Sequence, residues 1–123
     1  MSAKDNSVFV RHMRDATRRI QSYVEDVDKS DYAEDVVLQD AVVRQLEILG
    51  EAAGRVSRDF ANDHPEIPWS DITGMRHRLI HDYFEVDVDL VWTTATKHVP
   101  DVQNKIVALL EKMGVSGSRP GAC

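Results

Sequence analysis

The chain has 123 residues, enough for one domain with its own hydrophobic core. Its content of 42% hydrophobic and 29% charged residues is ordinary for a globular protein. The formal net charge of −6 argues against broad, non-specific binding of nucleic acid, because such binding grows with the number of phosphates neutralised. It does not exclude a local cationic pocket.

The single cysteine is the last residue, Cys123, which excludes a disulfide framework and a cysteine-rich zinc site. No apolar run approaches the roughly 18 residues of a membrane-spanning helix. The polar segment 1–6 lacks the hydrophobic core of a signal peptide. These features predict a cytoplasmic protein that does not enter a membrane.

Apolar residues at alternating steps of four and three predict a first helix over residues 6–27. A polar turn follows, and Ser30 or Asp31 is expected to cap a long second helix over residues 32–61. The apolar face of this second helix is wide. It is formed by Leu38, Val42, Leu46, Leu49, Ala53, Val56 and Phe60, and is extended by Val36, Val43 and Ala52.

Gly50 and Gly54 lie inside this second helix at a four-residue spacing. Glycine in a helix interior costs about 1 kcal/mol relative to alanine, so close approach of another helix is the expected compensation. The wide apolar face and the glycines together suggest that the protein forms a dimer.

Pro65 and Pro68 are expected to end the second helix, because proline removes a backbone donor and disfavours helical geometry in the residue before it. A shorter helix over residues 70–83 should follow, with Ser70 as its cap.

Asp87 or Asp89 is expected to cap a last helix, which extends to residue 113. Pro100 should introduce a kink or divide this helix into two abutting segments. Residues 114–123, rich in glycine and serine, predict a flexible tail after a folded domain of residues 1–113. Together the pattern predicts an all-α, antiparallel bundle of four or five helices.

The strongest candidates for a functional site are Arg76, His81 and Tyr83, which form an Arg-x4-His-x-Tyr motif. Arginine can hold two phosphate oxygens at once, and histidine moves protons near neutral pH. On an ideal helix, however, Arg76 and His81 lie about 140° apart. Either the helix ends or bends near His81, or a dimer brings both copies of the motif into one cleft.

The segment Gly74-Met75-Arg76, continued by His81-Asp82-Tyr83-Phe84, resembles the signature of the HEPN superfamily. It is specifically similar to the HepT-like toxins that are paired with a minimal nucleotidyltransferase antitoxin. Segments 44–53, 64–69 and 86–92 are similar to that family as well, so the resemblance spans about residues 8–113. In one departure, His77 stands where the family pattern leads us to expect asparagine.

The resemblance implies a homodimer with a composite site at the two-fold interface. With Arg76 and His81 in that site, cleavage of tRNA or mRNA fits the residues: His81 transfers protons and Arg76 stabilises charge on the phosphoryl group. No metal or cofactor is expected, because the ribose 2′-hydroxyl supplies the nucleophile. The expected products are a 2′,3′-cyclic phosphate and a 5′-hydroxyl, and DNA should be inert.

Tyr83 has two interpretations. It can be a core or interface tyrosine whose hydroxyl bonds to a neighbour. The resemblance instead implies that the antitoxin transfers AMP to it, which would place bulk and negative charge beside Arg76 and His81 and repel RNA.

His77 and His81 have the four-residue spacing of two metal ligands on one helix face. The glutamate of the zinc-protease motif and an obvious third ligand are missing, so no metal site is predicted. His77 and Arg78 are instead candidates for contact with RNA phosphate.

Arg11, Arg14 and Arg18 form a basic stripe on the first helix. A solvated face is the favoured interpretation, and a track for the RNA backbone is the alternative. Trp69 and Trp92 are expected to anchor the core. No catalytic role is assigned to Glu51.

Three functions compete at this point. The favoured one is a metal-independent endoribonuclease toxin, neutralised by modification of Tyr83. The second is a non-catalytic subunit that binds substrate or nucleotide for a separate nucleotidyltransferase. The third is a structural dimerisation domain without a ligand.

Overall fold

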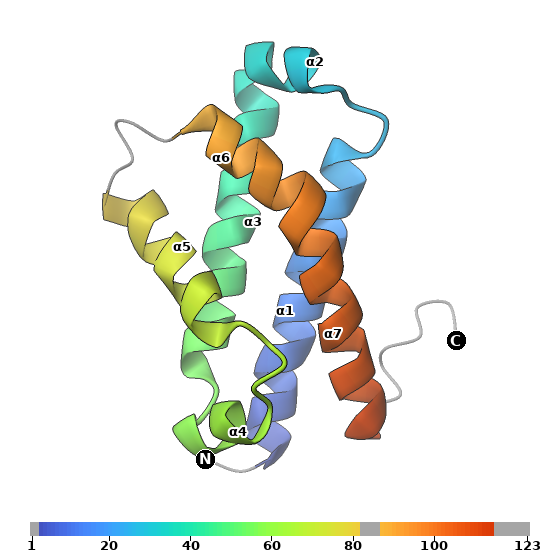
Figure 1. Cartoon of the computed structure of the whole chain (residues 1–123), viewed down its shortest axis with the longest axis vertical. Helices are drawn as coiled ribbons and strands as arrows, with labels where there is room; N and C mark the ends of the chain where they lie inside the picture. Colours follow the sequence, from blue (N-terminus) through green and yellow to red (C-terminus); the bar gives the residue numbers. More distant parts are fainter. Residues whose placement is uncertain (1–2, 82–86, 115–123) are drawn as a thin grey trace.

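The computed structural model describes residues 3–81 and 87–114, and every regular element in these two ranges is helical. The elements are α1 (Ala3–Val24), α2 (Lys29–Glu34), α3 (Val36–Arg55), α4 (Arg58–Asp63), α5 (Trp69–His81), α6 (Val88–Thr93), the π-helical turn η2 (Thr94–His98) and α7 (Val99–Lys112). Successive long helices run in opposite directions (Figure 1). The predicted all-α antiparallel bundle is confirmed.

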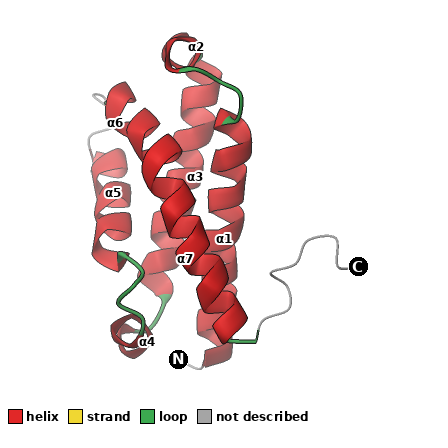
Figure 2. Cartoon of the chain, turned by 45° about the vertical axis from the view of Figure 1, so that its right-hand side comes forward, coloured by secondary structure: helices red, strands yellow, loops and turns green. Residues whose placement is uncertain are grey.

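Helix α1 packs against both α3 and α7, and α3 packs on its other side against α5. The short helices α2 and α4 lie at opposite ends of the bundle (Figure 2). The core contains the apolar stripe predicted for the first helix, with Met13, Ala16 and Ile20 at most 1% exposed. No helix in the described part of the chain is long and apolar enough to cross a membrane.

The first helix ends at Val24, before the predicted residue 27. Asp26 explains the early end, because its φ of +60° lies in the left-handed region, which aspartate tolerates better than most residues. The next helix is capped by Asp28, which accepts a hydrogen bond from the backbone N–H of Asp31 at 2.9 Å. This bond lowers the pKa of the Asp28 carboxyl. The prediction of Ser30 or Asp31 as the cap was therefore wrong.

The predicted long helix over residues 32–61 was also wrong, since the chain forms α2, α3 and α4 there. Asp35 separates the first two and caps α3 by accepting from the N–H of Leu38 at 3.0 Å. Ser57 caps α4 by accepting from the N–H of Phe60 at 3.2 Å. Val36, expected to extend the apolar face, lies in the first turn of α3 and is 65% exposed.

A tertiary contact holds the second break in place. The side-chain oxygen of Asn6 accepts from the backbone N–H of Ser57 at 2.9 Å, and its amide nitrogen donates to the Ser57 hydroxyl at 3.3 Å. Asn6 is buried in α1, so these bonds fasten the α3–α4 junction to the first helix. The helix break thus gives hydrogen-bond partners to the buried side-chain oxygen and nitrogen of Asn6, which a continuous helix would leave unpaired.

The predictions for the last helix are largely confirmed. Asp87 caps α6 by accepting from the N–H of Leu90 at 3.0 Å. The expected interruption takes the form of the π-helical turn η2, and Pro100 lies in the first turn of α7 directly after it. Proline cannot donate a helical hydrogen bond and collides with the preceding turn, and the wider π turn accommodates both effects.

Helix α5 begins at Trp69, so Ser70 lies inside its first turn and is not its cap as predicted. Its predicted end at Tyr83 lies outside the described residues. The predicted tail also lies outside them from residue 115 onward.

Tyr32 gives a stability prediction, because its side chain is only 1% exposed and its hydroxyl has no hydrogen-bond partner among the described residues. Its ring packs on Trp92 with centroids 5.0 Å apart. The Tyr32→Phe variant keeps this packing and removes a hydroxyl whose unpaired burial costs about 1–3 kcal/mol. Urea unfolding at pH 7 should therefore give an unchanged or higher free energy of unfolding, and a clear decrease would contradict the assignment.

The same variant tests an alkaline transition. Burial raises the pKa of Tyr32 to about 12, whereas an unfolded tyrosine ionises near about 10. The stability that depends on the protonated Tyr32 is therefore complete below the unfolded pKa of about 10. It is lost as the pH rises from there to the folded pKa of about 12. The wild type should lose more stability than Tyr32→Phe over that interval.

Candidate functional site

The Arg-x4-His part of the motif lies on α5, which rests on α3. Gly50 of α3 sits directly against the Cβ of Arg76, so closely that a methyl group on Gly50 would overlap that atom. The predicted close approach of another helix to the glycines is confirmed at this position. The approaching helix belongs to the same chain, so the glycine spacing by itself does not indicate a dimer.

Two contacts constrain the Arg76 side chain. Its stem packs on Gly50, and its guanidinium nitrogen Nη2 lies 3.7 Å from Oε1 of Glu51. The second oxygen of Glu51 lies 3.8 Å from Nη2 of Arg55, so two cations share one carboxylate. The Arg76 side chain remains 39% exposed, which leaves its guanidinium accessible to an anion.

Glu51 is the residue that sequence reasoning missed. Its contact with Arg76 joins residues from two different helices. No short motif predicts such a pair, and the only local signal was the adjacent Gly50, which indicated close helix packing there.

His81 lies at the other end of α5 and is exposed. Its ring is 4.2 Å from that of His77, measured between centroids, and the two planes are inclined by 44°. Among the described residues, no hydrogen bond or ion pair joins Arg76 to His81, in accordance with their separation of about 140° around the helix. Within a single chain, α5 therefore does not bring Arg76 and His81 together to contact the same phosphate.

The remaining predicted residues divide into three groups. Arg78 is exposed on α5 near both histidines in sequence. Tyr83 lies outside the described residues. On α1, Arg11 and Arg18 are partly exposed, but Arg14 is only 7% exposed and its guanidinium contacts Asp15 at 3.1 Å. The predicted solvated stripe is therefore wrong at Arg14, because this position is enclosed by packing of α1 in the bundle.

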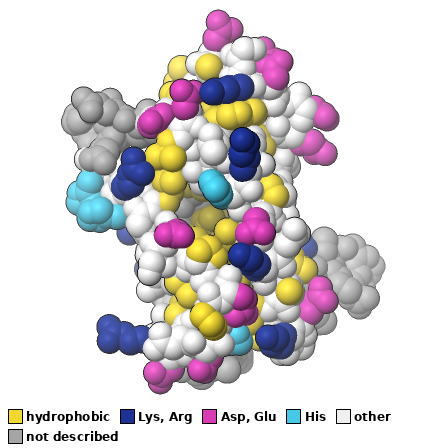
Figure 3. Space-filling view, in the orientation of Figure 1, with side chains coloured by type: hydrophobic (Ala, Val, Ile, Leu, Met, Phe, Trp, Pro, Cys, Tyr) yellow, Lys and Arg dark blue, Asp and Glu magenta, His cyan; other side chains and the backbone are white. Residues whose placement is uncertain are grey.

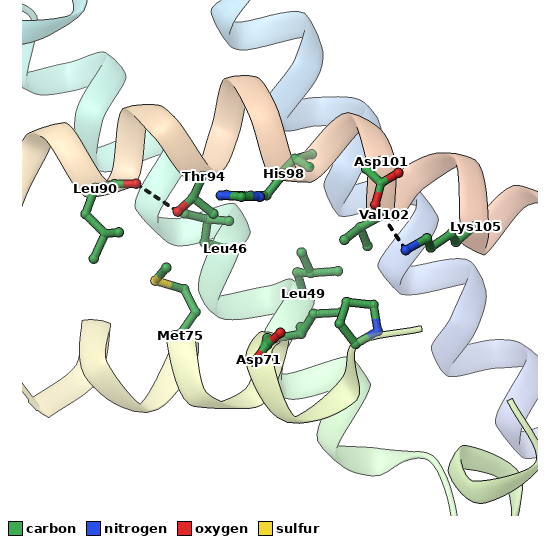
Figure 4. Close-up of a pocket in the computed structure, with 13 residues that line it drawn as sticks. Leu46, Leu49, Asp71, Met75, Leu90, Thr94, His98, Asp101, Val102 and Lys105 are labelled. Atoms are coloured by element: carbon green, nitrogen blue, oxygen red, sulfur yellow. Dashed lines mark hydrogen bonds and ion pairs between the residues drawn. The ribbon is translucent and has the colours of Figure 1, made fainter. Parts of the chain in front are cut away.

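A groove that the sequence did not predict lies between α5 and the rod formed by α6, η2 and α7, with α3 as its floor. Its volume is about 440 Å³. Figure 3 shows this hollow with an apolar base and charged side chains around it. In Figure 4, Met75 and Asp71 of α5 face His98 and the ion-paired Asp101 and Lys105 across the opening. Arg76 and His81 do not line this groove.

The described residues contain no group of three or more histidine, cysteine, aspartate or glutamate side chains placed to hold a metal ion. His77 and His81 are a pair of potential ligands without a third. The geometry thus presents a partly exposed arginine, in contact with Glu51, and an exposed histidine on different sides of one short helix.

Residues 13–109 match the sequence model of the family described as Ribonuclease HepT-like. The chain belongs to this family. The match includes all of α3 and α5, and therefore Arg76, His81 and the Gly50 contact. It confirms the resemblance to HEPN proteins that the motif suggested.

Individual relatives agree with this membership. A protein of Thermococcus cleftensis, whose name proposes a ribonuclease HepT, is 37% identical over 101 residues, covering 82% of this chain and 92% of that protein. A protein of Caldanaerobacter subterraneus subsp. tengcongensis, whose name proposes an RNase, is 34% identical over 104 residues, covering 85% and 93%. A protein of Methanocaldococcus jannaschii with a similar name is 30% identical over 106 residues, covering 86% and 97%. No solved structure matches the chain significantly.

Gly50, which is in close contact with Arg76, and Gly74, which has open space around it, give a matched pair of variants in this HepT-like chain. Gly50→Ala should destabilise the fold by about 1–3 kcal/mol, because the new methyl group forces α3 and α5 apart at the Arg76 stem. A Cβ on Gly74 would meet no atom within 4 Å. Gly74→Ala should therefore raise stability by up to about 1 kcal/mol through helix propensity.

Urea unfolding of both variants and the wild type measures the difference. Equal stabilities for the two alanine variants would contradict a close α3–α5 contact at Gly50.

Proposed function

We propose that this HepT-like chain is a metal-independent endoribonuclease that acts as the toxin of a toxin–antitoxin pair. The observation that carries the proposal is the accessible Arg76 guanidinium, paired with Glu51, on the same helix as an exposed His81. Membership of the family described as Ribonuclease HepT-like, and the RNase names of the relatives, support this choice of reaction.

Each residue has a defined role in the proposed reaction. His81 takes the proton from the ribose 2′-hydroxyl, or protonates the leaving 5′-oxygen. Arg76 stabilises the negative charge that builds on the phosphoryl oxygens in the transition state. Glu51 orients Arg76 by its ion pair, while the neighbouring Arg55 keeps the local charge positive. The products are a 2′,3′-cyclic phosphate and a 5′-hydroxyl, so DNA is not a substrate.

The separation of Arg76 and His81 around α5 supports a composite site. Two copies of the chain related by a two-fold axis can place Arg76 of one protomer beside His81 of its partner. Such an arrangement supplies both groups to one phosphate without bending the helix. We therefore include a homodimer in the proposal.

Further polar and cationic side chains are proposed to guide the RNA backbone. Arg78 and His77 are exposed next to His81 in sequence and are the nearest candidates. Arg11 and Arg18 on α1 are more distant in sequence, and Arg14 is excluded from this role by its burial. With a net charge of −6, the chain depends on such local groups for RNA binding.

Cleavage of bulk tRNA and of an mRNA in excess EDTA tests the proposed activity. The wild type should produce fragments with cyclic-phosphate ends, whereas Arg76→Ala and His81→Ala should lose cleavage by about 100-fold or more, as expected for a lost proton-transfer or charge-stabilising group. His12→Ala is the matched control, since His12 is an exposed histidine on α1. Intact RNA from folded, unmodified wild type would contradict the proposal.

Mixing the two inactive variants tests the composite site. If one protomer supplies Arg76 and its partner supplies His81, random dimers of Arg76→Ala and His81→Ala contain one complete site in about half of the molecules. About a quarter of the wild-type activity should then return. No recovery after verified subunit exchange would contradict a site of this composition.

We also propose that Tyr83 is the point of control. A nucleotidyltransferase partner would attach AMP to its hydroxyl, and the added phosphate would occupy the nearby cations of the motif and repel RNA. After incubation with ATP and such a partner, intact-mass measurement should show an AMP adduct on the wild type and none on Tyr83→Phe. An adduct that persists in Tyr83→Phe would place the modification elsewhere.

The groove between α5 and α7 favours the second candidate function. A non-catalytic subunit for a separate nucleotidyltransferase needs a pocket for substrate or nucleotide, and the groove volume of about 440 Å³ is within the range of small-molecule sites. This function predicts nucleotide binding that a bulky substitution of Met75 abolishes, together with no cleavage of RNA.

A further inference from the structure

His77 and His81 form a pair of metal-ligating side chains at the end of α5. Their positions four residues apart place both imidazoles on one helix face, one turn apart. The ring centroids are 4.2 Å apart. Among the described residues, neither ring has a hydrogen bond or an ion pair that would hold its nitrogens in another role.

The helix face that carries this pair is open. Gly74 lies on the same face, three residues before His77, and a Cβ placed on it would meet no atom within 4 Å. Both histidines are exposed. Both imidazoles are therefore accessible to an ion from solvent.

We propose that His77 and His81 together bind one divalent transition-metal ion of the Zn²⁺, Ni²⁺ or Cu²⁺ class, and that the bound ion inhibits the ribonuclease. Neutral imidazole is a preferred ligand of these ions, whereas Mg²⁺ and Ca²⁺ prefer oxygen. The described residues supply no third ligand, so water completes the coordination and the ion exchanges with solvent. The site is thus reversible and regulatory, and it has no part in the chemistry of cleavage.

The inhibitory half of this inference rests on the proposed function. A His81 nitrogen that donates its lone pair to a metal ion cannot accept the proton of a ribose hydroxyl. The ion also holds the imidazole in a fixed direction, towards His77. Binding of the metal and transfer of the proton therefore exclude each other at this side chain.

The pair depends on His77. Asparagine at this position would offer an amide in place of the second imidazole and so would remove one nitrogen ligand. His77→Asn is consequently the most direct variant for testing the site.

Calorimetric titration with Zn²⁺ and with Ni²⁺ tests the binding on the full-length, tag-free chain. All proteins carry Cys123→Ser, because a thiolate is itself a strong ligand of these ions. The parent should bind saturably, and His77→Asn and His81→Asn should each bind at least about tenfold more weakly, the smallest effect expected from disturbing a metal site. His12→Asn, the control at an exposed histidine on α1, should bind like the parent.

Equal affinity of the parent and His77→Asn would overturn the site. Binding of Mg²⁺ with comparable affinity would overturn the assignment to imidazole ligands. Imidazole proton and carbon NMR signals provide an independent check, since only the His77 and His81 signals should shift when a diamagnetic ion is added.

The regulatory half is tested by comparing cleavage of RNA in EDTA and in Zn²⁺, with each variant measured against itself. At a free Zn²⁺ concentration about tenfold above the dissociation constant from calorimetry, the parent should cleave about tenfold more slowly than in EDTA, and added EDTA should restore its rate. The ratio for His77→Asn should remain near one, whatever its rate in EDTA. Equal inhibition of both proteins would overturn the regulatory role.

The two proposals fail in different ways. A parent protein that binds Zn²⁺ through the pair and cleaves no RNA in EDTA would contradict the ribonuclease function and leave the metal site standing. A parent that cleaves RNA and binds no metal would contradict the site and leave the ribonuclease standing.

Discussion

The close contact between α3 and α5 at Gly50 is the constraint on which the candidate site depends. Helix α5 rests on α3, and the absence of a side chain at Gly50 allows the Arg76 stem to lie against the backbone of α3. The ion pair with Glu51 then favours one direction of the guanidinium. The contribution of this exposed pair to stability is small, about 0–1 kcal/mol. Its importance for the proposed function lies in orientation, because an arginine that is already oriented loses less freedom when it binds an anion.

Once Arg76 faces α3, the geometry of a helix directs His81 elsewhere. Five residues correspond to about 140° of rotation, so the histidine emerges on the open face next to His77. This rotation separates Arg76 from His81 and leaves both side chains at least partly exposed. The four-residue spacing of His77 and His81, in contrast, brings the two histidine rings together. The proposed composite ribonuclease site and the proposed metal-binding pair both start from these positions on α5.

The rest of the bundle shows how local and distant interactions share control of helix length. Asp35 and Asp87 end or begin helices through hydrogen bonds to backbone groups three residues away, a purely local effect. At Ser57 the break is reinforced by Asn6, which is 51 residues distant and buried in α1. The apolar residues keep their helical spacing across this break, so the sequence pattern predicted one long helix over residues 32–61. The backbone instead leaves the helix between α3 and α4.

The sequence alone determined the helical class, the buried stripe of the first helix and the interruption near Pro100, and it limited the cap of the last helix to Asp87 or Asp89, because each depends on residues within one or two helical turns. It also made Arg76 and His81 the candidate catalytic residues and showed that one straight helix separates them. Tertiary structure decided which helix approaches the glycines, that Glu51 meets Arg76, that Arg14 is buried, and that a groove opens beside α5. These features arise from packing between helices far apart in the chain, which the periodicity of a single helix does not encode.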